Sequence, residues 1–168
     1  LLPVTFATIH GDLNMENILV EGDGSSAYFI DFARSKRDHV LRDLLHLEMA
    51  VVTQLGAEML HTGSLSTDMI VDFYRHLTYG RQAKLPVELH RLYTIVQAIR
   101  QIASEHLYQR DDWREYNIGL FLYLLGALRF DNLDTIPTAP YPKRIAFKGA
   151  AVLLELLTVP TNLETAHA

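Results

Sequence analysis

A glycine-rich turn between two β-prone runs constrains the fold of this chain more than any other feature. Residues 18–20 (Ile-Leu-Val) and 27–30 (Ala-Tyr-Phe-Ile) favour strands, and residues 21–26 between them (Glu-Gly-Asp-Gly-Ser-Ser) are a dense turn cluster. Two β-prone runs around such a turn predict an antiparallel hairpin. The hairpin would bring its two flanking residues, Asn17 and Asp31, close together.

An aspartate shortly before this hairpin completes a set of residues that suits phosphoryl transfer. Asp12 can receive a proton from a hydroxyl group, while Asn17 and Asp31 can hold Mg²⁺ against nucleotide phosphates. Mg²⁺ prefers hard oxygen ligands and keeps several waters, so one carboxylate and one amide oxygen are sufficient beside phosphate oxygens. The transition state requires positioning and charge neutralisation rather than covalent help. The structural alternative is that Asp12 caps a helix or a turn.

Three short segments resemble the catalytic half of the protein-kinase-like superfamily: His-Gly-Asp at residues 10–12, Asn-Ile-Leu-Val at 17–20 and Ile-Asp-Phe at 30–32. The closest branch is the aminoglycoside/choline phosphotransferase type, in which Gly commonly stands where protein kinases have Arg. Residues 39–48 also resemble phosphotransferase-like domains of large bacterial signalling proteins. The similarity in motifs covers residues 9–48, and the helices that follow agree with the family in type and order alone.

The resemblance implies a role for each residue of the motif. Asp12 would be the catalytic base or the residue that orients the acceptor hydroxyl. Asn17 and Asp31 would be the magnesium ligands beside ATP, and Leu19 and Ile30 would form part of the floor under adenine. The intact protein would then transfer the γ-phosphoryl group of ATP to an acceptor hydroxyl on a small molecule or a protein.

The resemblance also implies how the catalytic loop is supported. His10 would help to hold the loop, and a buried Asp43 would accept hydrogen bonds from the backbone around His10 and Gly11. Some positions depart from the family pattern, namely Asn14 in place of a His, Met-Glu at 15–16 in place of Pro-Gly, and Ala33 in place of the Gly of Asp-Phe-Gly. None of these changes removes a metal ligand or the base, so their expected effect is on loop flexibility or on the fit of the acceptor.

The amino-terminal half of a kinase-like site is absent from these residues. Kinase-like enzymes hold ATP between two lobes, and the amino-terminal lobe supplies a phosphate-covering loop and a strand lysine. Residues 1–9 contain neither feature. The first residues lack an initiator Met and a basic leader, so the sequence looks like a cut inside a longer protein. We expect such a fragment to bind Mg-ATP poorly, to be inactive alone, and to expose an apolar face through which copies or a partner associate.

From about residue 38 the hydrophobic period becomes helical. The expected helices span approximately residues 38–60, 66 or 67 to 80, 86–107, 111 or 112 to 130, and 143–157. In the fourth helix, residues 119–125 are apolar nearly all round, which predicts a central buried helix. The predicted fold class is therefore mainly α with a small β-hairpin (α+β), a kinase-like C-terminal lobe of about five helices over residues 1–160, with residues 161–168 as a frayed tail.

Composition excludes several other classes of function. The chain is 49% hydrophobic and can bury one core, while its net charge of -5 gives no basic surface for nucleic acid or for an anionic membrane. The absence of cysteine removes disulfides, thiolate catalysis and cysteine-ligated zinc. No apolar run reaches the roughly 18 residues of a membrane span. We expect a cytoplasmic protein with neither a nucleic-acid nor a membrane partner.

Several other polar residues allow either a structural or a functional role. The histidines show no His-Glu-x-x-His or comparable ligand spacing, so they are expected in solvent or at the edge of the core. Three basic residues follow Asp31 closely, and they either approach phosphate or an acidic acceptor or lie in a solvated loop: Arg34, Lys36 and Arg37. Arg42 and Glu48 either pair with each other or line an acceptor cleft.

Two other functions remain open at this point. The domain could be a non-catalytic module of a bacterial signalling or defence protein, which keeps its cleft for nucleotide sensing or for docking a partner. Alternatively, the chain is a helical interaction domain in which the motif is coincidental. The coincidental motif predicts that Asn17 and Asp31 lie far apart.

Overall fold

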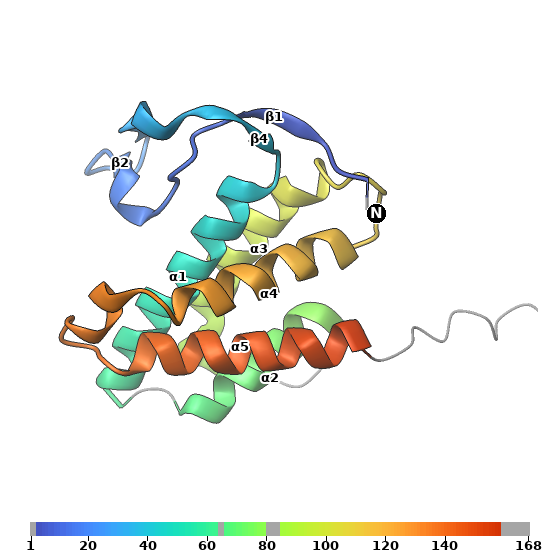
Figure 1. Cartoon of the computed structure of the whole chain (residues 1–168). Helices are drawn as coiled ribbons and strands as arrows, with labels where there is room; N and C mark the ends of the chain where they lie inside the picture. The colour runs from blue at the N-terminus through green and yellow to red at the C-terminus, as the bar shows by residue number, and fades with distance from the viewer. Residues whose placement is uncertain (1–2, 64–65, 80–84, 159–168) are drawn as a thin grey trace, which may run out of the picture.

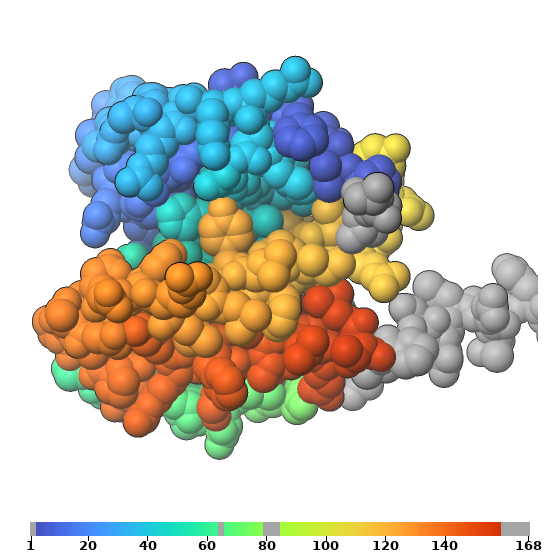
Figure 2. All heavy atoms as spheres, viewed as in Figure 1, coloured from blue at the N-terminus to red at the C-terminus, as the bar shows by residue number. Residues whose placement is uncertain are grey.

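The computed structural model describes residues 3–63, 66–79 and 85–158. The strands and turns come first in the sequence and form a thin layer across one end of a helical body (Figure 1). The space-filling view shows the same division, with the N-terminal residues in blue as a cap above the helices in orange and red (Figure 2). The residues of the predicted site lie in this cap and in the first turn of the first helix.

The cap contains two antiparallel sheets of two strands each within the described residues. Strand β1 (Phe6–Ile9) pairs with β4 (Lys36–His39), and β2 (Ile18–Val20) pairs with β3 (Ala27–Phe29). The β2–β3 sheet is the hairpin that the glycine-rich turn predicts, and this prediction is confirmed.

Strand β4 is not predicted by the sequence. Its residues, Lys-Arg-Asp-His, are polar or charged and show no alternation of apolar and polar side chains. They form a strand because β1 offers its backbone groups along the whole segment, from Phe6 opposite His39 to Ile9 opposite Lys36. Pairing with a partner strand here outweighs the local propensity of the residues.

The helical body contains five α-helices among the described residues: α1 (Arg42–His61), α2 (Thr67–Tyr79), α3 (His90–Ser104), α4 (Arg114–Ala127) and α5 (Tyr141–Thr158). Short 3-10 turns accompany them in the same part of the chain: η1 (Met15–Asn17), η2 (Phe32–Arg34), η3 (Val87–Leu89) and η4 (Asp131–Asp134). The predicted fold class, mainly helical with a small β-hairpin, is confirmed.

The helix boundaries differ from the predicted ones for local reasons. Helix α1 begins later than residue 38 because the preceding residues belong to β4. Helix α3 ends at Ser104, although Leu107 beyond it is still buried against the core. Helix α4 ends at Ala127, and the chain turns through η4 rather than continuing to Phe130 as a helix. Gly80, the expected end of the second helix, and the predicted tail lie outside the described residues.

The central helix is α1 rather than α4. Helix α1 packs against α3, α4 and α5, and residues 48–53 are buried on every side. Helix α4 packs against α1 and α5 on one side and lies next to α5 in Figure 1. Its opposite side exposes Leu122 and Leu125, whose exposed fractions are 59% and 39%. The prediction that α4 is buried all round is therefore wrong.

A buried ion pair joins three of the helices. Glu48 on α1 is fully buried, and its Oε1 lies 2.7 Å from Nη2 of Arg100 on α3. The hydroxyl of Tyr116 on α4 donates a hydrogen bond of 2.6 Å to Glu48 Oε2. Burial lowers the pKa of Arg100, but the adjacent Glu48 carboxylate more than compensates, so this pKa ends above its usual value. Glu48 therefore neither pairs with Arg42 nor lines an acceptor cleft.

No helix in the described part of the chain combines the length and the apolar character needed to cross a membrane.

Candidate functional site

The loop between β1 and η1 is fixed to the start of α1. Asp43, in the first turn of α1, accepts hydrogen bonds from the backbone N–H groups of His10 (2.6 Å, to Oδ2) and Gly11 (2.9 Å, to Oδ1). These are the two hydrogen bonds that the kinase-like resemblance implies. Asp43 is half-buried rather than buried. Because both carboxylate oxygens are engaged, the backbone just before Asp12 has a defined position relative to α1.

Gly11 is required by the close approach of this loop to η2. Its φ of +87° lies in the left-handed region, which favours glycine. A Cβ atom at this position would lie 2.1 Å from the backbone carbonyl oxygen of Arg34. No side chain fits there, so the glycine lets the loop between β1 and η1 pack directly against the backbone of η2.

His10 connects the same loop to the end of the hairpin. Its Nε2 lies 2.7 Å from the carbonyl oxygen of Ile30, so Nε2 carries the proton and donates. The imidazole ring also packs against Phe32, with ring centroids 4.7 Å apart. Since Ile30 and Phe32 flank Asp31, His10 holds both sides of the second aspartate.

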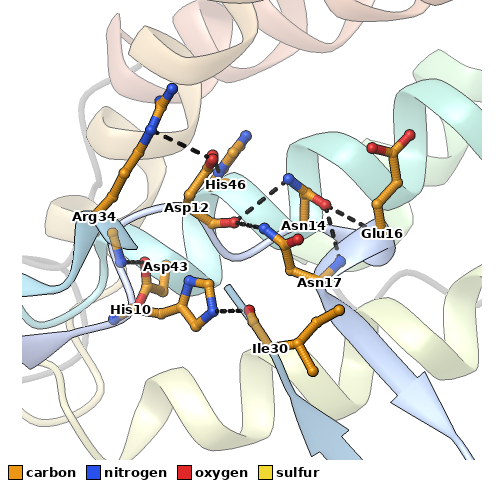
Figure 3. Close-up of polar contacts among 10 residues, drawn as sticks. His10, Asp12, Asn14, Glu16, Asn17, Ile30, Arg34, Asp43 and His46 are labelled. Carbon is orange, nitrogen blue, oxygen red and sulfur yellow. Dashed lines mark hydrogen bonds and ion pairs between the residues drawn. The ribbon is translucent and has the colours of Figure 1, made fainter. Parts of the chain in front are cut away.

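Asn17 is fixed in a way that leaves its amide oxygen unused. The side-chain Nδ2 donates a hydrogen bond of 2.8 Å to the backbone carbonyl oxygen of Asp12 (Figure 3). Asn14 caps η1 by accepting from the backbone N–H groups of Glu16 (2.9 Å) and Asn17 (3.3 Å). No hydrogen bond to Asn17 Oδ1 occurs within the described residues. Asn14, a departure from the family pattern, thus helps to position Asn17.

Asp31 stands beside Asn17 with a free carboxylate. The Ile30 N–H donates to the Asn17 carbonyl oxygen at 3.1 Å, which extends the hairpin ladder to the residue before Asp31. Asp31 is exposed, has φ 60° and ψ 61°, and makes no side-chain cap for η2. A non-glycine residue in this left-handed region marks a strained position, of the kind that often belongs to a functional site. The placement of Asp31 next to Asn17 is the opposite of what a coincidental motif predicts.

The donor set suits Mg²⁺ in its chemistry. An amide oxygen and a carboxylate are hard ligands, and Mg²⁺ accepts one or two protein groups when phosphate oxygens and waters complete its shell. The described residues contain no group of three or more His, Cys, Asp or Glu side chains that could hold a metal ion without a further ligand. Asn17 and Asp31 together provide two protein ligands, the number that Mg²⁺ takes when phosphate oxygens and waters complete its shell.

The predicted adenine-floor residues lie in the hairpin and directly after it. The register pairs Leu19 with Tyr28, and the added backbone hydrogen bond pairs Asn17 with Ile30. Side chains alternate along a strand and paired residues point to the same face. Leu19 and Ile30 therefore lie close to Asn17 along the ladder, and their exposed fractions are 52% and 37%.

The Asp12 carboxylate points away from the hairpin. Its Oδ2 lies 3.7 Å from Arg34 Nε and its Oδ1 lies 4.0 Å from His46 Nδ1. In Figure 3 the carboxylate faces Arg34 and His46, whereas the backbone carbonyl of Asp12 faces Asn14 and Asn17. Asp12 thus lies between two surfaces. The hairpin side carries Asn17 and Asp31, and the opposite side carries Arg34 and His46.

A groove of about 590 Å³ lies on this second side. The loop between β1 and η1 forms one wall, and α1 contributes His46, Thr53 and Gln54. Tyr123 of α4 and residues at and after the end of α4, among them Phe130 and Asn132, complete it. Figure 2 shows the hollow between the blue cap and the orange segment. The size and the mixed aromatic and hydrogen-bonding lining are typical of a small-molecule site.

Sequence reasoning missed the residues of this groove. Arg34 approaches Asp12 rather than a phosphate position near Asp31, while its side chain remains 73% exposed. His46 lies three positions after Asp43, and residues three apart share a face of a helix. That spacing would have placed His46 beside the catalytic loop, but the residues from the end of α4 have no such local signal.

Comparison with known proteins gives one family. A family model described as Ternary complex associated domain 9 matches residues 3–129, which include the cap and helices α1 to α4. That description names no kinase. No curated protein and no solved structure matches the chain.

Proposed function

The chain belongs to the Ternary complex associated domain 9 family, and we propose that it is the catalytic lobe of a kinase-like phosphotransferase. In this proposal, ATP and Mg²⁺ occupy the hairpin side of Asp12, and an acceptor bearing a hydroxyl group occupies the groove on the other side. The acceptor is a small molecule or a side chain of a protein. A cytoplasmic location, where ATP and Mg²⁺ are available, fits this activity.

The single observation that carries the proposal is the hydrogen bond from Asn17 Nδ2 to the Asp12 carbonyl oxygen, at 2.8 Å. It fixes the amide so that the nitrogen is committed to the protein and the oxygen remains for a ligand. The neighbouring Asp31 also has a carboxylate that no described hydrogen bond or ion pair uses. Two hard oxygen ligands with no partner among the described residues are expected where a cation binds.

The residues of the chain supply base, orientation and charge separation in this reaction. The acceptor hydroxyl gives its proton to the Asp12 carboxylate, its oxygen forms a bond to the γ-phosphorus, and the bond from that phosphorus to the bridging oxygen breaks. Mg²⁺ held by Asn17 and Asp31 supplies neutralisation of the phosphate charge when bound. Leu19 and Ile30 offer an apolar surface for adenine.

A labelled-nucleotide assay tests this function. The chain in molar excess is incubated with [γ-³²P]ATP and Mg²⁺, so that even slow transfer to water or to a supplied alcohol is detected in a single turnover. Asp12→Asn should reduce transfer by at least about a hundredfold, the lower range for loss of a general base. Asp72→Asn, which alters an exposed carboxylate on α2, is the matched control. Transfer by wild type that persists undiminished in Asp12→Asn would contradict the proposal.

The second candidate function is a non-catalytic interaction module, and the surface of the hairpin favours it. Leu19, Val20, Tyr28 and Phe29 are each more than half exposed. A two-stranded hairpin with apolar side chains in solvent is marginal alone and gains stability when another surface covers it. The family description links the domain to a ternary complex, so a protein partner or a second copy could provide that surface.

The two functions respond differently to paired variants. If the chain acts by association, Tyr28→Ser with Phe29→Ser should abolish self-association or complex formation in light scattering, and Asp12→Asn should leave it intact. If the chain acts by catalysis, Asp12→Asn removes the biological effect although association persists.

A further inference from the structure

His46 occupies the groove beside Asp12 without a role in the functions described so far. It lies on α1, and its Nδ1 is 4.0 Å from Asp12 Oδ1. Both residues line the 590 Å³ groove. His46 is thus a side chain of α1 that faces the predicted base from the acceptor side.

The imidazole ring is held by packing rather than by a hydrogen bond. It stacks on Tyr123 of α4, with ring centroids 5.8 Å apart and an angle of 28° between the ring planes. Its side chain is 22% exposed, so most of the ring is covered while one edge meets the groove. A covered ring with a nitrogen directed at a carboxylate is a prearranged hydrogen-bonding group.

The separation of the two polar atoms suggests what belongs between them. At 4.0 Å, Asp12 Oδ1 and His46 Nδ1 are too far apart for a direct hydrogen bond. An oxygen atom placed about 2.8 Å from each of them satisfies ordinary hydrogen-bond lengths on both sides. We propose that this position is that of the acceptor hydroxyl, and that His46 binds and orients the oxygen that Asp12 deprotonates. This inference rests on the proposed phosphotransferase function.

The charge state of His46 is compatible with that role. Burial lowers the pKa of His46, and Asp12 and Asp43 oppose this shift only in part, while Arg42 and Arg34 reinforce it. The imidazole is therefore neutral at neutral pH, with one nitrogen that donates and one that accepts. A neutral ring leaves the Asp12 carboxylate free to take a proton, whereas an imidazolium would hold that carboxylate in an ion pair.

His46 does not itself keep the transferred proton. The hydroxyl proton passes to Asp12 Oδ1, and the oxygen, still held by the His46 Nδ1–H, forms the new bond to the γ-phosphorus while ADP leaves. The imidazole has the same protonation state before and after the step. His46 therefore determines where the oxygen stands and contributes to the choice of acceptor.

Two substitutions distinguish the contribution of Nδ1 from that of the aromatic ring. His46→Phe keeps an aromatic ring to stack on Tyr123 and removes Nδ1. His46→Asn keeps a polar atom at the δ position and removes the ring. If the nitrogen matters, His46→Phe should lower transfer from [γ-³²P]ATP to water by about tenfold, the value of one hydrogen bond, and His46→Asn should retain more of the rate than His46→Phe.

Further readouts distinguish failure of this inference from failure of the proposed function. Binding of a fluorescent ATP analogue with Mg²⁺ should be the same in wild type and both variants, because His46 lies on the acceptor side. With glycerol as the competing acceptor, the ratio of glycerol phosphate to inorganic phosphate should change in His46→Phe. An unchanged rate and product ratio in His46→Phe, or a greater loss in His46→Asn, would overturn the inference while leaving the phosphotransferase intact. Transfer that wild type performs and Asp31→Asn loses supports the underlying function. Wild-type transfer that continues when the metal is removed with EDTA overturns both.

Discussion

The predicted base, Asp12, owes its position to residues that hold the backbone on either side of it. Asp43 fixes the N–H groups before it, and Asn17 fixes its carbonyl oxygen. Among the described residues the contacts of the carboxylate itself are long, 3.7 Å to Arg34 and 4.0 Å to His46. At the scale of single residues, the site combines a rigid backbone with an uncommitted carboxylate, which is the arrangement a positioned base requires.

Asp43→Asn tests the support of the loop. Asn offers one acceptor oxygen, and its NH₂ group would face a backbone N–H, so one charge-assisted hydrogen bond is lost and two donors meet. The free energy of unfolding should fall by about 1.5–3 kcal/mol, measured by urea denaturation. Asp72→Asn, on the exposed side of α2, is the control and should change little. A loss no larger than that of the control would mean that Asp43 does not hold the loop.

Gly11→Ala tests the close approach of the loop to η2. The added Cβ would lie 2.1 Å from the Arg34 carbonyl oxygen at a residue with φ +87°, so the loop must move. We expect a loss of more than about 1 kcal/mol in unfolding free energy. Gly22→Ala is a matched control in the hairpin turn, because a Cβ added at Gly22 meets nothing within 4 Å and the φ of this residue lies outside the left-handed region. Equal effects of the two substitutions would contradict this account.

Titration of His46 by NMR tests the electrostatics of the groove. Burial lowers its pKa below the ordinary value of 6.5, and the Asp12 carboxylate acts in the opposite direction. Asp12→Asn should therefore lower the pKa further. The pKa of His46 is lower in the folded protein than in the unfolded chain. The contribution of His46 to the free energy of unfolding is therefore fully present above its pKa in the unfolded chain, and it is lost as pH falls through its pKa in the folded protein. The difference in unfolding free energy between wild type and His46→Phe should change over that acidic range. A measured His46 pKa of 6.5 or higher would contradict the lowering that burial is expected to cause.

At the scale of elements, the sequence predicts what is encoded locally. The hairpin follows from two β-prone runs and the turn at 21–26, and the helices follow from their hydrophobic period. Strand β4 and the central place of α1 depend on partners far away in the sequence. The run at residues 119–125 is as apolar as a central helix, but packing against α1 and α5 covers only one side of it.

The buried pair Glu48–Arg100 sets the relative position of α1 and α3. Removing one partner leaves a charge in the core, so Glu48→Gln or Arg100→Met alone should cost about 3–5 kcal/mol. Glu48→Gln combined with Arg100→Met should cost less than the sum of the two single changes, because the double variant leaves no unpaired charge. Urea denaturation of the complete cycle measures the coupling, and strict additivity would argue against a paired interaction.

At the scale of the whole molecule, the site lies where two layers meet. The cap contributes Asp12, Asn17 and Asp31, and the helical body contributes Asp43, His46 and the far wall of the groove. The motif in the sequence identifies the cap residues because their chemistry depends on close spacing. It does not identify the groove, whose wall comes from α4 and from the chain after it, and these residues approach Asp12 only through the packing of α4 on α1.

The central claim is that Asn17 and Asp31 together hold the metal of a bound nucleotide. Paramagnetic Mn²⁺, added with ATP to ¹⁵N-labelled protein, broadens backbone resonances close to the metal. We predict broadening centred on Asn17 and Asp31 that is lost in Asp31→Asn and retained in Asp23→Asn, a matched acidic change in the hairpin turn. Broadening that survives in Asp31→Asn, or that centres on other carboxylates, would contradict the account.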